Sequence, residues 1–137
     1  MHQRTCLSLD DAQRILGAIQ AELEGRGRGA AIAVVDEHGE LIAFARTDTC
    51  PLPSINNAIN KAFTAAREGR PSRAIGDASR SDAFPLTNFG DLRYVGWGGG
   101  IPILRDQRPI GAVGVSGLPE EEDMALAQLG VAALMAG

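Results

Sequence analysis

Aromatic residues, cysteines and histidines are scarce in this 137-residue chain. Aromatic residues make up only 4% of the sequence, so the core must consist mainly of Ala, Val, Ile and Leu. The two cysteines, Cys6 and Cys50, are too few for a disulfide framework and lack the CxxC spacing of metal sites. Two distant histidines, His2 and His38, do not form the pattern of a zinc cluster. This composition favours a reducing, cytoplasmic location.

Long hydrophobic runs and blocks of basic residues are also missing. No apolar run approaches the about 20 residues that span a membrane, and the N-terminus lacks the apolar segment of a signal peptide. The net charge is −4, and acidic and basic residues are interspersed. Because nucleic-acid binders normally present a basic face, we expect partners other than nucleic acids or membranes.

Hydrophobic periodicity predicts one α+β domain over residues 1–137. Apolar residues at helical spacing predict helices at 9–24, at 55–68 and after Pro119, with Ser8 and Ser54 as N-caps. Short apolar or β-branched runs predict strands at 31–35, 41–47, 92–97, 101–104 and 109–116. Because hairpins join neighbouring strands, we expect an antiparallel sheet covered by helices on one or both faces.

Two segments have no regular period. Residues 79–91 are long for a loop in a compact domain, which is typical of functional or mobile segments. Three glycines, Gly98–Gly100, follow Trp97 and let the backbone approach a ligand or a neighbouring helix. We therefore take Trp97, Gly99 and Gly100 as ligand-binding candidates, with a core or subunit contact as the alternative for Trp97.

Three segments, taken in order, resemble the GlcG/HbpS family. They are AIAVVDEHGELIAFAR with the following Thr47-Asp48, SINNAINKAFTAAREGRP with its Lys-Ala-x-Thr-Ala motif, and GGGIPILRDQRPIGAVGVSGLPEEEDMALAQLG. Only residues 76–97 depart from the family pattern. The resemblance implies a profilin-like α/β/α fold with a five-stranded antiparallel sheet. It also implies a homo-oligomer, and a family that includes haem-binding proteins and a PduO-type domain.

Haem is the first ligand that this resemblance implies. Haem iron takes an axial ligand such as His, Cys, Met or Tyr. His38 lies in a predicted hairpin turn and is the candidate iron ligand, while His2 lies next to the N-terminus. A solvated turn histidine is the alternative interpretation of His38.

A small anion is the second candidate ligand. Asn57, Lys61 and Thr64 share one face of a predicted helix, and Arg46 ends a predicted strand. Arginine pairs bidentately with carboxylates and lysine supplies a point charge. The alternative is a polar helix face in water, with Lys61 paired to Asp48.

Three functions therefore stay open. The first is a binding protein for haem or another small ligand. The second is a lyase, hydratase or isomerase acting on a small carboxylated catabolic metabolite. In that enzyme Arg46 and Lys61 hold the anion, and Asp36 or Asp48 moves a proton. The third is a structural or regulatory oligomer without a ligand.

Overall fold

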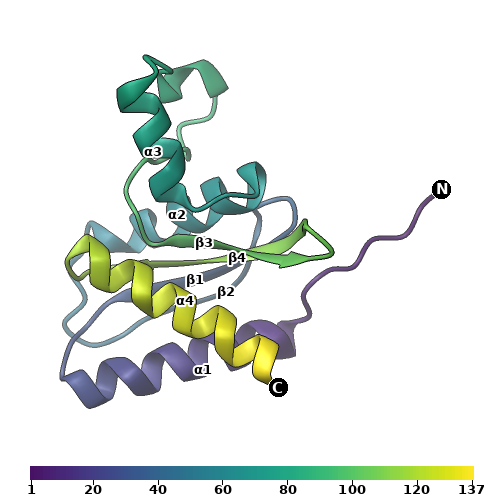
Figure 1. Cartoon of the computed structure of the whole chain (residues 1–137). Coiled ribbons are helices and arrows are strands. Elements are labelled where there is room, and N and C mark those ends of the chain that lie inside the picture. The colour runs from purple at the N-terminus through teal and green to yellow at the C-terminus, as the bar shows by residue number, and fades with distance from the viewer.

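The computed structural model describes residues 1–137 and shows a four-stranded antiparallel sheet with helices on both faces (Figure 1). The elements are α1 (Leu9–Arg26), β1 (Ala31–Asp36), β2 (Leu41–Arg46), α2 (Ser54–Glu68), α3 (Ser72–Ser81), the 3-10 helix η1 (Leu86–Phe89), β3 (Gly100–Arg105), β4 (Arg108–Ser116) and α4 (Glu120–Ala136). The strand order is β2-β1-β4-β3, and every neighbouring pair is antiparallel. The predicted α+β class with an antiparallel sheet is therefore confirmed. No helix combines the length and apolar character needed to cross a membrane.

The predicted fifth strand is wrong, because residues 92–97 pair with no strand and instead contain a turn at 92–93, irregular backbone at 94–96 and a bend at 97. The Asp91 carboxylate accepts a hydrogen bond from the backbone N–H of Arg93 at 3.0 Å, which tightens a turn. Further along the chain, the backbone N–H of Val95 donates a hydrogen bond to the Thr64 hydroxyl at 3.0 Å. Side chains thus take the backbone bonds that a neighbouring strand would have taken.

Strand β1 is buried because helices cover both faces of the sheet. Ile32 and Val34 pack in one core with residues of α1 and α4, whereas Ala31 and Ala33 pack against α2. The alanine-rich side lets α2 approach the sheet closely. At Gly114 of β4, an added Cβ would overlap the backbone of α2.

The helix ends follow local sequence signals. Ser8 forms a capping box with Asp11 at the start of α1, and Gly27 takes the left-handed conformation that ends this helix. The expected cap at Ser54 is wrong, since Pro53 occupies the N-cap position and no side chain caps α2. Ser54 is instead the first helical residue and is buried.

Residues 79–91 are more ordered than a loop. They contain the end of α3 and the whole of η1, which together project from one end of the sheet (Figure 1). The rings of Phe89 and Tyr94 stack at 3.9 Å between centroids, and Tyr94 in turn contacts Phe63 of α2 edge-on at 5.5 Å. Aromatic contacts therefore fasten this projection to the body of the protein.

Candidate ligand-binding site

Lys61 is the only lysine among the 13 basic residues of the chain, and it is buried. Its ammonium group donates to the Val115 carbonyl at 3.0 Å and to Asp123 Oδ2 at 3.1 Å. These contacts join α2, β4 and α4. They use two of the three N–H groups of the ammonium, so one donor remains for a ligand.

Asp123 is the buried partner of this cation, with a side chain that is only 3% exposed. Its second oxygen, Oδ1, accepts the backbone N–H of Leu118 at 3.0 Å. Burial raises the pKa of Asp123 above its ordinary value of 3.8, and Lys61 opposes that rise. The carboxylate therefore binds a proton more readily than an exposed aspartate does.

A cavity of about 390 Å³ opens onto this ion pair. We call it the Lys61 pocket, and its lining residues are Ser54, Asn57, Lys61, Trp97, Ser116, Gly117, Leu118, Glu120 and Asp123. They come from the start of α2, the end of β4, the start of α4 and the loop before β3. Side chains from four segments thus converge at one end of the sheet.

Three polar side chains in this pocket have no hydrogen-bond partner within the chain. Ser54 is 7% exposed and Ser116 is 6% exposed, and neither hydroxyl bonds to another protein group. The half-buried amide of Asn57 is also free. These polar atoms are not fully buried, since only Glu37 Oε2 is both buried and without a partner, so they face the cavity and are free to bond to water or to a ligand.

The triglycine segment, Gly98–Gly100, packs closely against Lys61 of α2. Gly99 has a φ of +132°, and a Cβ there would lie 2.9 Å from Lys61 Nζ. A Cβ on Gly100 would overlap the Lys61 carbonyl. These glycines allow close contact with α2 and do not line the cavity, whereas Trp97 lines it and is 59% exposed.

Thr64 does not line the Lys61 pocket either. Its side chain is fully buried, and its hydroxyl donates to the Asn60 carbonyl at 2.9 Å while accepting the N–H of Val95. Thr64 therefore holds the segment after η1 against α2. Of the predicted helix face, the structure brings only Asn57 and Lys61 into the cavity.

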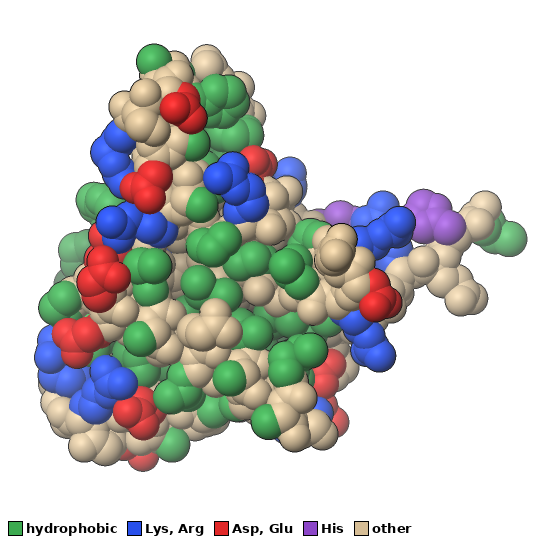
Figure 2. Space-filling view, in the orientation of Figure 1, with side chains coloured by type: hydrophobic (Ala, Val, Ile, Leu, Met, Phe, Trp, Pro, Cys, Tyr) green, Lys and Arg blue, Asp and Glu red, His purple; other side chains and the backbone are tan.

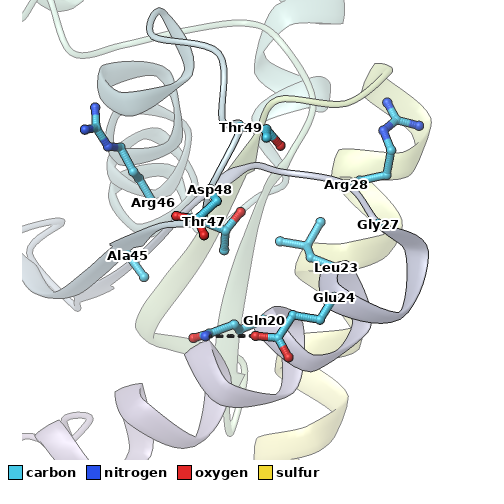
Figure 3. A pocket seen from close by; sticks show the side chains of 10 residues that line it. All are labelled: Gln20, Leu23, Glu24, Gly27, Arg28, Ala45, Arg46, Thr47, Asp48 and Thr49. Atoms are coloured by element: carbon cyan, nitrogen blue, oxygen red, sulfur yellow. Dashed lines mark hydrogen bonds between the residues drawn. The ribbon is translucent and has the colours of Figure 1, made fainter.

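Arg46 and Asp48 line a different cavity, of about 500 Å³, between the C-terminal end of α1 and the end of β2 (Figure 3). In this view the Arg46 guanidinium points away from the α1 side chains. The structure thus separates Arg46 from Lys61, and Lys61 pairs with Asp123 rather than with Asp48. The expected anion clamp of Arg46 and Lys61 is not formed.

Asp36 and His38 belong to the hairpin turn between β1 and β2. Asp36 Oδ1 accepts the backbone N–H groups of His38 at 2.8 Å and Glu40 at 3.0 Å. This carboxylate therefore shapes the turn, as aspartates commonly do. Asp36 does not reach the Lys61 pocket.

The histidines do not fit haem within a single chain. Haem needs an iron ligand, and its macrocycle favours apolar walls. The His38 side chain is 60% exposed. His2 lines a largely polar cavity of about 700 Å³ together with Arg4, Arg105 and Arg108. His38 is thus largely exposed to solvent, and nearly all residues that line the cavity at His2 are polar.

Comparison of the sequence with protein families gives a match over residues 7–132 to a family described as "Haem degrading protein HbpS-like". An uncharacterised 15.0 kDa protein from the dhaT-dhaS intergenic region of Citrobacter freundii is 32% identical, covering 92% of this chain and 90% of that protein. The protein GlcG of Escherichia coli K12 is 31% identical, with 85% of each chain covered.

Solved structures are similar over nearly the whole chain. Klebsiella pneumoniae ORFY superposes with a TM-score of 0.93 at 27% identity, covering 100% of this chain and 96% of that one. The PduOC–haem complex superposes with a TM-score of 0.86 at 28% identity, covering 93% and 94%. The likeness to ORFY includes the segments that build the Lys61 pocket, because it covers the whole chain.

Proposed function

This chain belongs to the HbpS-like family, and we propose that it is a small-ligand-binding protein whose ligand occupies the Lys61 pocket. The observation that carries the proposal is that the hydroxyls of Ser54 and Ser116, which have no protein partner, line the same cavity as Lys61, whose ammonium keeps one free N–H. A ligand with polar oxygen atoms satisfies all of these groups at once.

The charges of the pocket favour a neutral ligand. The lining holds one cation, Lys61, against two carboxylates, Asp123 and Glu120. Arg73 lies 3.2 Å from Glu120 Oε2 but does not line the cavity. We therefore propose a small hydroxy or oxo compound. Its carbonyl oxygen accepts from Lys61, and its hydroxyl groups bond to the two serines.

Ligand binding is testable through the single lysine. In protein labelled with ¹³C-lysine, hydroxyacetone should shift the one side-chain signal of Lys61 in a saturable manner. Asn57→Ala should weaken binding about fivefold, since one hydrogen bond contributes about 1 kcal/mol. Arg46→Ala, in the other cavity, should leave the affinity unchanged. Equal losses in both variants, or no shift with either hydroxyacetone or glycerol, would contradict the proposal.

Haem is a second candidate ligand, favoured by the likeness to the PduOC–haem complex. A haemin titration followed by visible spectroscopy separates the two candidates. Because His38 is largely exposed to solvent and the cavity at His2 is largely polar, we expect a broad Soret band that does not saturate. A sharp, saturable band that is lost in His38→Ala or His2→Ala would establish haem binding and identify the iron ligand.

We also propose a homo-oligomer in a reducing, cytoplasmic setting. Figure 2 shows hydrophobic side chains in the middle of one face, with charged side chains toward its rim. Leu104 of β3 and Met135 of α4 are among the exposed apolar residues, and β3 is an edge strand. Such a surface suits contact with another copy of the chain. Both cysteines are free thiols, which is typical of reducing compartments.

A further inference from the structure

We propose that the Lys61 pocket is also an active site, which enolises a small neutral carbonyl compound with Asp123 as the base and Lys61 as the oxyanion stabiliser. This inference rests on the proposed function, because the carbonyl compound must first bind in the same cavity. It adds a reaction to binding, and binding can occur without it.

The two reacting groups are adjacent in the cavity wall. Lys61 Nζ and Asp123 Oδ2 lie 3.1 Å apart, and their side chains are 4% and 3% exposed. Because Asp123 bonds to the same ammonium, a carbonyl compound held by the remaining N–H of Lys61 lies next to both groups. A cation at the oxygen and a base near the α-carbon are the two groups that enolisation requires.

The step balances without a further reactant. The α-carbon–hydrogen bond breaks, and its proton forms an O–H bond with the Asp123 carboxylate. The electron pair of the broken bond forms the carbon–carbon double bond, while the carbonyl π pair moves onto the oxygen. The Lys61 ammonium stabilises the resulting enolate. Return of a proton from Asp123 to carbon regenerates the carbonyl compound and the carboxylate.

Asp123 is the carboxylate in the pocket that is best suited to this role. Glu120 accepts the N–H of Gly98 through one oxygen and pairs with Arg73 at 3.2 Å through the other. Both oxygens of Asp123 also accept hydrogen bonds, but its cationic partner is Lys61 inside the pocket, whereas the cationic partner of Glu120, Arg73, does not line the cavity. The buried position of Asp123 raises its pKa, which increases its strength as a base.

The experiment follows exchange of the α-protons of hydroxyacetone in D₂O by ¹H NMR, with the full-length protein. The wild-type protein should accelerate exchange by about 100-fold or more over buffer, the usual range for a positioned acid or base. Asp123→Asn should abolish the acceleration and still shift the labelled Lys61 signal. Asp48→Asn, a matched change at an exposed carboxylate, should exchange at the wild-type rate.

The outcomes distinguish the two proposals. Binding without exchange in the wild-type protein would overturn the catalytic inference alone, and no binding would overturn both. Exchange that survives in Asp123→Asn would exclude Asp123 as the base. If Asp123→Asn is unfolded by circular dichroism, Lys61→Met/Asp123→Asn removes both charges and serves in its place. Exchange by this folded double variant would likewise overturn the inference.

Discussion

Lys61→Met is expected to lower the free energy of unfolding by about 3–5 kcal/mol, the usual cost of leaving a buried charge without its partner. The variant keeps a side chain of similar length, so the packing of α2 changes little. Asp123 stays buried against Leu118 but loses the ammonium that lies 3.1 Å away. Urea denaturation at pH 8 measures this loss.

The pH dependence of the stability of Lys61→Met tests whether the unpaired charge of Asp123 causes the loss. Folding raises the pKa of Asp123, so the folded state binds a proton more tightly than the unfolded state does. Stability linked to this group is therefore present below its ordinary pKa of 3.8 and is lost as the pH rises through the folded value. Lys61 lowers the pKa of Asp123, so its removal raises that pKa further. The loss in the free energy of unfolding of Lys61→Met should therefore be larger at pH 8, where Asp123 is charged, than at pH 5.

A second variant completes this test. Lys61→Met/Asp123→Leu replaces the ion pair with apolar groups and should recover most of the lost stability, because no unpaired charge remains. A deficit that is independent of pH, or one that the double variant does not reduce, would show that packing rather than charge explains the loss.

Gly114→Ala is expected to cost about 3 kcal/mol or more, which is at the upper end of overpacking in a core. The added Cβ would overlap the Ala58 carbonyl and lie 2.8 Å from the backbone N of Ala62. Because both obstacles are helical backbone, α2 must move away from β4. Lys61 moves with it, so hydroxyacetone affinity should fall together with the melting temperature.

Gly17→Ala is the matched control for this prediction. Gly17 lies in α1, and an added Cβ would meet no atom within 4 Å. Alanine favours a helix interior over glycine by about 1 kcal/mol, so this variant should be more stable than the wild type. Equal effects of the two substitutions would show that the contact between β4 and α2 is looser than the structure indicates.

Local patterns in the sequence predict most of the fold. The N-cap at Ser8 and the apolar run of β1 follow from neighbours along the chain, and the structure contains both. Residues 92–97 resemble a strand in composition, but Asp91 and Thr64 bind their backbone groups. Thr64 lies 31 residues from Val95, and no local pattern reports such a contact.

The site is less predictable for the same reason. Lys61 and Asn57 are recognisable because they share one helix face, but the partner of Lys61 is 62 residues away. Asp123 sits in a run of four acidic residues that looks like an ordinary helix start. Arg46 ends a strand and looks like a ligand for anions, yet the topology places it at another cavity. The sequence thus identifies Lys61 as a candidate but not Asp123, its partner in the pocket.

The single buried lysine gives this protein a built-in chemical probe. In the folded chain, the only lysine amine is largely shielded from acylating reagents, because the Lys61 side chain is only 4% exposed. Lys61 becomes reactive only when its ammonium leaves the hydrogen bonds to Val115 and Asp123 and loses a proton. The slow acylation of Lys61 therefore reports the frequency of that local opening, without an introduced label.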